Sequence, residues 1–283
     1  MTTEFSVIYE EFAENLEALK AVVTAFSTPG AGSGKTRVAA ANSATLLLAA
    51  TFEEFVREMA RAYAKAVIAS CATIDDVPMK FIKHVWSRYV DGFAKMQFDN
   101  KIKREESISA AHSRFTLFHE FSLGDLSKDI YKELIHNENN MRPQQINNLF
   151  TISNLSNLCL QISETYPLSG HFNSPDQGKI HGLLLDDLND FMQRRNDVAH
   201  AIAMSSSSGS DQLAKDIEFL RCIGEAMSIT LGALAPKPYC SLEHAQPATS
   251  PIAMQAAPAP SNGQQGMLAR LFHRLRASGN GPH

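Results

Sequence analysis

The chain has 283 residues, of which 44% are hydrophobic and 20% charged, and its formal net charge is −4 at pH 7. This composition is ordinary for a soluble globular protein and is sufficient to bury a core without cross-links. The slightly acidic balance counts mildly against a protein that coats nucleic acid through its overall charge and is neutral for a nuclease. Any nucleic-acid site must therefore be a local basic patch.

Four cysteines lie far apart in the sequence and form no CxxC pair. This pattern predicts neither a disulfide framework nor a zinc site, and it is typical of a reducing compartment. No secretory signal follows the acidic start Met1–Glu4. The longest apolar run, Ala44–Phe52, is too short to cross a bilayer. We therefore expect a cytoplasmic protein without stable membrane insertion.

Helical periodicity dominates the N-terminal third of the chain. Apolar residues recur at steps of three and four over 4–26, which predicts an amphipathic helix. A long second helix is predicted over 41–72, apolar first and then charged. Pro78 is suited to open a third helix over 78–97. The region 99–125 is ambiguous.

The second part of the chain also favours helices. Asp125 or Ser127 is a candidate N-cap for a short helix that ends near Ile135, and Pro143 is suited to the first turn of another. No strand pair or internal repeat is found, so the sequence predicts an all-α fold. The remaining predicted segments are a helix over 152–165, a loop with Pro167, Gly170 and Pro175, a helix over 176–203, a flexible break over 205–210 and a last helix over 211–234.

The composition changes after Ala235. Six prolines, mixed with Ala, Ser and Gln, predict a disordered linker over 236–266. The last segment, 267–283, starts with the basic amphipathic stretch MLARLFHRLR. A frayed tail is its simplest interpretation. The functional alternative is a peptide that docks to RNA, to a partner groove or to an anionic membrane surface.

The predicted 176–203 helix contains the segment RNDVAH at 195–200. Within it, Asn196 and His200 are four residues apart and share a helix face. Arg195 and His200 are five apart, about 140° around an ideal helix. They can meet only through the long Arg side chain or through a second subunit. A guanidinium binds phosphate oxygens and an imidazole transfers protons near neutral pH, so this group of residues suits a phosphodiester.

RNDVAH resembles the signature of HEPN-superfamily ribonucleases, an Arg followed by a polar residue, a spacer and a His. Three further segments are similar to the HEPN-like nuclease branch associated with RNA repair, the RiboL-PSP-HEPN type. They are NSATLLLAATFEEFVRE (42–58), NNMRPQQINNLF (139–150) and LDDLNDFMQR (185–194). The resemblance covers most of 1–235 in the right order. It implies a HEPN-like helical bundle with long antiparallel helices.

The resemblance also implies an activity, a metal-independent cleavage of RNA by 2′-hydroxyl attack that needs no cofactor. His200 would act as general base or acid, Arg195 would hold the scissile phosphate, and Asn196 would orient the phosphate or the ribose. HEPN nucleases generally form dimers with the two motifs facing each other, so the implied partners are RNA and a second copy. A toxin–antitoxin or phage-defence setting would add a cognate antitoxin or defence partner. The alternative is a non-catalytic HEPN module that binds a nucleotide, RNA or a partner protein.

A structural role is the alternative for these side chains. Arg195 could pair with an aspartate on a solvated face of its own helix, at Asp187, Asp190 or Asp197. The family arrangement would bring Glu53 and Glu54 close to the motif helix, where an ion pair with an arginine is a simpler role for them than catalysis.

Two other motifs compete with the one at 195–200. Arg114 and His119 have the same spacing, but an aromatic residue, Phe115, follows the Arg. We interpret this pair as a chance match. The segment GAGSGKT at 30–36 resembles the phosphate loop of P-loop helicases, which would make the chain an NTPase. Such a loop follows a buried strand, whereas a predicted helix precedes this one, so we expect a flexible connector.

Overall fold

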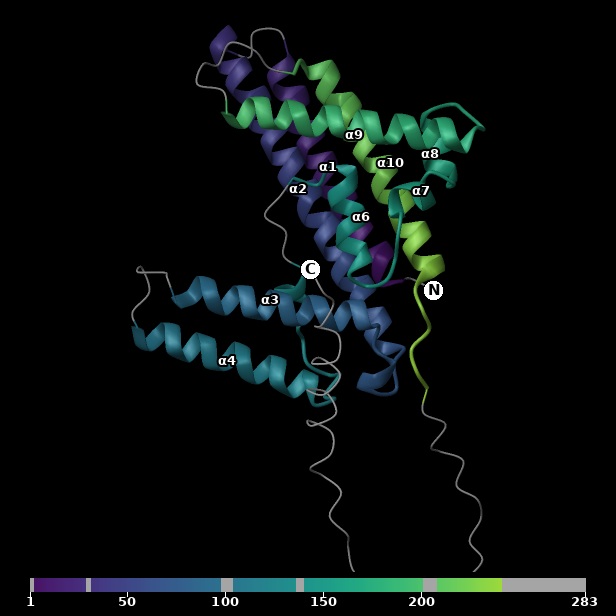
Figure 1. Cartoon of the computed structure of the whole chain (residues 1–283). Coiled ribbons are helices and arrows are strands. Elements are labelled where there is room, and N and C mark those ends of the chain that lie inside the picture. The colour runs from purple at the N-terminus through teal and green to yellow at the C-terminus, as the bar shows by residue number, and fades with distance from the viewer. Residues whose placement is uncertain (1–2, 29–31, 98–103, 136–139, 201–207, 241–283) are drawn as a thin grey trace, which may run out of the picture. The chain divides into compact units, whose positions relative to one another are not determined.

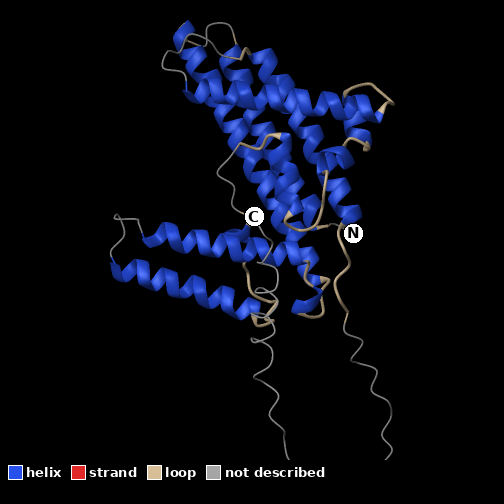
Figure 2. Cartoon of the chain, in the orientation of Figure 1, coloured by secondary structure: helices blue, strands red, loops and turns tan. Residues whose placement is uncertain are grey.

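A computed structural model describes residues 3–28, 32–97, 104–135, 140–200 and 208–240. Within these ranges the chain forms helices and no strand, which confirms the all-α prediction (Figures 1 and 2). Contacts between residues divide the chain into two units, Met1–Ser241 and Leu242–His283. The second unit lies outside the described residues, and with it most of the predicted linker and the basic segment at 267–283. The predicted domain boundary at residue 235 stays a prediction.

The described helices differ widely in length, from one turn to ten. The long ones carry the bundle, and the short ones connect them. In chain order they are α1 (Glu4–Ser27), α2 (Gly34–Ala69), a 3-10 turn (Ile74–Asp76), α3 (Met79–Gln97), α4 (Arg104–Ser122), α5 (Tyr131–Leu134), α6 (Pro143–Thr151), α7 (Leu158–Ile162), α8 (Tyr166–His171), α9 (Gln177–His200) and α10 (Ser210–Leu234).

Helices α1, α2 and α10 pack against one another along their lengths. The rings of Phe12 in α1 and Phe55 in α2 stack with their centroids 4.1 Å apart. In α10, Gly224 lies directly against Phe12, since a Cβ atom at this position would come within 2.9 Å of the ring. A glycine is therefore required where α10 approaches α1.

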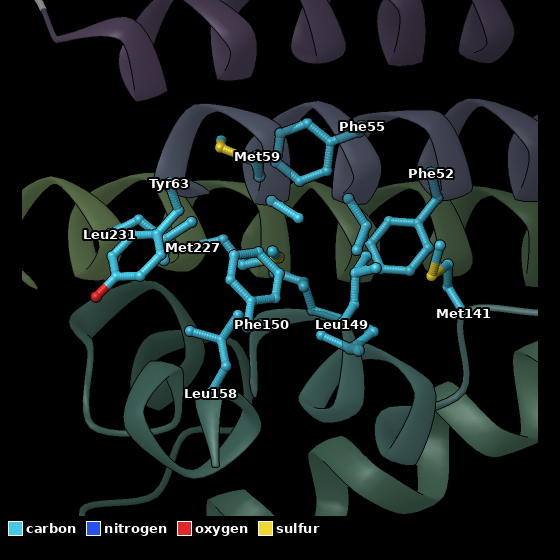
Figure 3. Packing of buried hydrophobic residues seen from close by; sticks show 14 of the residues in the cluster. Phe52, Phe55, Met59, Tyr63, Met141, Leu149, Phe150, Leu158, Met227 and Leu231 are labelled. Atoms are coloured by element: carbon cyan, nitrogen blue, oxygen red, sulfur yellow. The ribbon is translucent and has the colours of Figure 1, made fainter. Parts of the chain in front are cut away.

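The short helix α6 closes the core on the side of α2 and α10. Figure 3 shows Phe150 of α6 pointing towards α2 and α10, next to Tyr63 and Met227. The rings of Tyr63 and Phe150 have their centroids 6.3 Å apart. Because Phe150 is buried almost completely, it contributes roughly 1.5–3 kcal/mol of hydrophobic free energy to this junction.

Helices α3 and α4 pack against each other, and α3 also contacts α5. Phe118 of α4 holds the pair together, because Tyr89 stacks on it at 4.6 Å and Trp86 meets it edge-on at 4.4 Å. The ambiguous region 99–125 thus contains a helix of 19 residues. The apolar residues of this helix do not recur on one face, and only Phe118 and Phe121 are buried. Helical periodicity in the sequence therefore did not predict it.

The second helix starts earlier than the predicted residue 41. Ser33 caps α2 by accepting a hydrogen bond from the backbone N of Thr36 at 3.2 Å, so Gly34 and Lys35 belong to the first turn. The predicted connector therefore ends at residue 33, and residues 29–31 lie outside the described residues. Helix α1, and not a strand, precedes this turn, which removes the structural context that a P-loop needs.

The predicted helix over 152–165 is wrong. Only α7, at residues 158–162, is helical, because Asn154 and Asn157 adopt the left-handed conformation at φ 64° and 55°. The loop predicted around Pro167 is wrong as well. This proline lies in the first turn of α8, a position where its missing N–H costs nothing.

The remaining predictions agree with the structure to different degrees. Helix α5 is a single turn whose first N–H, at Tyr131, bonds Asp129, so the expected caps Asp125 and Ser127 are wrong. Pro143 does open α6. The predicted bounds of α1, α3, α9 and α10 agree within a few residues, although 201–207 lie outside the described residues. No described helix is both long and apolar enough to span a membrane.

Candidate functional site

Helix α9 contacts α2, α6, α7 and α8 (Figure 1). Its apolar residues recur at helical spacing and are buried, which fixes the rotation of the helix. Polar side chains predominate from Gln193 on, and they reach towards neighbouring segments. The buried apolar residues are Ile180, Leu184, Leu188, Phe191 and Met192.

The adjacent arginines of α9 bind to two different helices. Arg194 donates to Asp216 of α10 with an N–O distance of 2.7 Å. Arg195 lies beside Glu53 of α2, with its Nη2 3.9 Å from Glu53 Oε1. Successive residues of a helix point about 100° apart, so each guanidinium has its own buried carboxylate. The carboxylate next to Arg195 thus comes from α2 and not from an aspartate of α9.

Glu53 is buried, with 8% of its surface exposed. Burial raises the pKa of its carboxyl, although the neighbouring Arg195 and Arg57 act to lower it. Arg57 contributes a hydrogen bond of 3.4 Å to Glu53 Oε2. Glu53 therefore lies within ion-pair distance of an arginine of the motif helix, as expected, whereas Glu54 pairs with Arg57 and Arg61 of α2 itself. The Glu53 carboxylate lies beside the guanidinium of Arg195 without a hydrogen bond to it.

Asn196 binds two neighbours through the same atom. Its Oδ1 accepts a hydrogen bond from Arg195 Nη1 at 3.2 Å and another from Asn140 Nδ2 at 2.6 Å. With the oxygen occupied in this way, the two N–H bonds of the Asn196 carboxamide are the groups left for a ligand. Asn140 is therefore a site residue that spacing within α9 does not indicate.

The segment before α6 makes a second contact with α9. Arg142 Nη2 donates to Gln193 Oε1 at 2.8 Å, and Gln193 Nε2 donates to Asp197 Oδ1 at 2.8 Å. These bonds place Arg142 against the polar end of α9, at Gln193. The sequence resemblance included Asn140 and Arg142 within 139–150, but it gave them no partners on α9.

His200 is the last residue of α9 and is exposed. It lies one turn beyond Asn196 on the same face, as expected from their spacing. Arg195 points about 140° away from His200 around the helix axis. The structure therefore joins Arg195 to Asn196 by a hydrogen bond and places His200 at the open end of the helix. A second copy would be needed to bring an imidazole opposite Arg195.

The other arginine and histidine at this spacing have different surroundings. Arg114 forms an ion pair with Glu133, and the ring of His119 stacks on Phe115 with their centroids 5.6 Å apart. Both side chains belong to α4. Among the described residues, no three or more His, Cys, Asp or Glu side chains are grouped so that they could hold a metal ion.

Residues 9–232 match the family described as RiboL-PSP-HEPN. The matched range includes Glu53, Asn140 and the whole 195–200 motif, and it extends from α1 into the last turn of α10. The resemblance inferred from the sequence is thereby confirmed. HEPN domains of this kind are associated with nuclease or nucleotide-related functions. Comparisons with curated proteins and with solved structures give no match.

Proposed function

The chain belongs to the RiboL-PSP-HEPN family, and from this premise we propose that it is a metal-independent endoribonuclease. The observation that supports the proposal best is the hydrogen-bonded pair Arg195–Asn196, in which Glu53 of α2 lies beside the guanidinium and Asn140 donates to the carboxamide. Both residues keep hydrogen-bond donors for a ligand, and His200 follows on the same helix. Donors that are held in place before the substrate arrives are suited to stabilise a charged transition state.

In the proposed reaction, the ribose 2′-oxygen attacks the neighbouring phosphorus and the bond from phosphorus to the 5′-oxygen breaks. His200 takes the proton of the 2′-hydroxyl or protonates the leaving 5′-oxygen. Arg195 binds the non-bridging oxygens of the phosphate, and the N–H groups of Asn196 orient the phosphate or the ribose. The products carry a 2′,3′-cyclic phosphate and a 5′-hydroxyl.

The active form in this proposal is a homodimer. Arg195 and His200 of one copy diverge by about 140°, so a two-fold axis beside the end of α9 would bring the imidazole of one copy towards the guanidinium of the other. One His200 then acts as base and its counterpart as acid. The molecular mass in solution tests this step. A protein that cleaves RNA as a monomer would contradict it.

The nuclease proposal is tested by incubating the purified chain with total RNA in excess EDTA and analysing the ends of the fragments. We expect cyclic phosphate and 5′-hydroxyl ends, and no cleavage by His200→Ala or Arg195→Ala. RNA binding by folded His200→Ala should persist. Binding without any cleavage by the wild type would instead support the alternative, a non-catalytic HEPN module.

The proposed setting is a cytoplasmic toxin–antitoxin or phage-defence system, in which an antitoxin or defence partner restrains the nuclease. Induced expression of the wild-type chain alone should then arrest the growth of the host. Expression of His200→Ala at the same level should not. Normal growth with wild-type protein that cleaves RNA after purification would contradict this setting.

A further inference from the structure

A cavity of about 500 Å³ lies between the start of α6, the start of α7 and the N-terminal half of α9. Carboxamides are the main polar groups that line it, and they come from all three segments. They are Gln144, Gln145, Asn147, Asn157 and Asn189. A cavity of this size fits a small planar molecule.

The other groups around this cavity favour an aromatic ligand attached to a polyanion. Leu160, Leu185 and His181 provide flat or apolar surface, and Arg142 is the one arginine at the rim. Among the described residues of the lining there is no carboxylate. Carboxamides pair with the donor and acceptor edges of nucleobases, and unpaired RNA bases bind to proteins through such edges together with apolar or imidazole faces.

Two of the carboxamides have hydrogen-bond partners within the protein. Asn147 Oδ1 accepts a hydrogen bond from the backbone N of Cys159 at 3.0 Å, which leaves the N–H groups of Asn147 for a ligand. Gln144 Nε2 donates to Asn148 Oδ1 at 2.8 Å, which leaves the Gln144 carbonyl as an acceptor. The lining thus offers amide N–H groups at Asn147, which a backbone bond orients, and a carbonyl at the exposed Gln144, and these two kinds of group pair with a base edge.

The cavity and the proposed cleavage site lie on the same helix, α9. Arg142 lines the cavity and also donates to Gln193 on α9. Asn189 lines it too, and Asn196 follows seven residues later, about 10 Å further along the helix and on nearly the same face. A single strand bound along α9 would therefore reach both places.

A second cavity on α9 has the opposite charge. It lies towards α10, has about 630 Å³ and is lined by four carboxylates, with Arg194 and Lys215 as its cations. The carboxylates are Asp187, Asp190, Asp216 and Glu218. Phosphate groups would be repelled there, so electrostatics directs RNA to the carboxamide-lined side of α9.

We propose that the carboxamide-lined cavity is a nucleobase subsite, which binds one unpaired base of single-stranded RNA next to the scissile linkage and selects the sequence that is cut. This rests on the proposed nuclease function. The base lies among Gln144, Asn147 and Asn189, while its backbone passes Arg142 towards Arg195 and Asn196.

The test is cleavage of a library of short RNAs with randomised positions, followed by sequencing of the products. The wild-type chain should show a base preference at one position near the cut. Asn189→Leu and Gln144→Leu, which replace the amide by an apolar side chain, should reduce the ratio of kcat/KM between preferred and rejected bases about tenfold. Asp187→Asn, in the acidic cavity, is the matched control and should keep the full preference.

Base preference in binding separates the subsite from the chemistry. With His200→Ala as the background, the affinity for four homopolymeric oligonucleotides should differ, and Asn189→Leu should make the four values more alike. Cleavage with no base preference, or an unchanged preference in both folded leucine variants, would overturn the subsite but leave the nuclease intact. Base-dependent binding without cleavage by the wild-type chain would overturn the nuclease proposal and leave the base-binding subsite in place. Thermal unfolding shows which variants are folded.

Discussion

Arg114 and His119 on α4 have the same spacing as Arg195 and His200 on α9, but the two pairs lie in different surroundings. Arg114 is paired with Glu133 at a position where both side chains are more than one third exposed. Its histidine stacks on an aromatic ring of the same helix. Arg195 is 29% exposed and contacts a buried carboxylate of α2.

The difference lies in how many distant segments meet at each pair. Asn196 is bonded to Asn140, 56 positions earlier in the chain, and Arg195 lies beside Glu53 of α2. Such convergence places functional groups before the ligand binds, which five-residue spacing alone does not achieve. The α4 pair therefore serves as an internal control in tests of the α9 pair.

Removal of the imidazole should have the largest effect. We expect His200→Ala to lower kcat for RNA cleavage by about 10²- to 10⁴-fold, because proton transfer is lost. His119→Ala should leave kcat unchanged. Single-turnover cleavage of a labelled RNA measures both. Equal losses in the two variants would remove the distinction between the pairs.

Removal of the Arg195 guanidinium should have the second-largest effect on RNA cleavage. Arg195→Ala should lower kcat/KM by about 10²- to 10³-fold, because the transition state loses a charged donor. Arg195→Lys should recover part of this loss, since lysine keeps the charge but lacks the planar fork of donors. Arg114→Ala should cleave like the wild type. If Arg114→Ala lost as much activity as Arg195→Ala, the assignment would be wrong.

The buried carboxylates of α2 and α10 provide a second matched pair, because Glu53 supports Arg195 and Asp216 supports Arg194. Glu53→Gln should lower kcat about tenfold through misplacement of the guanidinium. Asp216→Asn should leave kcat unchanged, even if it alters the stability. Circular dichroism confirms folding of both. Loss of cleavage in Asp216→Asn alone would point to the acidic cavity instead.

The smallest expected effect is on stability as a function of pH. Burial raises the pKa of Glu53 above its ordinary value of 4.5, so the native state binds more protons than the unfolded state in the window from 4.5 up to the raised pKa. The free energy of unfolding therefore falls as the pH rises through this window. Glu53→Gln should flatten that slope, as urea denaturation between pH 4 and 7 would detect. An unchanged slope would contradict a raised pKa.

Periodicity in the sequence predicted the long helices because each buries one regular apolar face. It failed between 152 and 175, where Asn154 and Asn157 use left-handed conformations that a pattern of apolar residues does not encode. The motif predicted Arg195, Asn196 and His200 as neighbours on one helix. Asn140 was not assigned to the site, because its contact with Asn196 depends on how α6 and α9 pack and not on local spacing.

The adjacent arginines of α9 also restrict how this helix can move. Arg194 is bound to α10 and Arg195 to α2, so rotation of α9 about its own axis would separate at least one guanidinium from its buried carboxylate. An unpaired buried charge is costly, often by 3–5 kcal/mol. Adjustment of the helix to a substrate should therefore occur by bending near His200, beyond the two anchoring residues, and not by a turn of the whole helix.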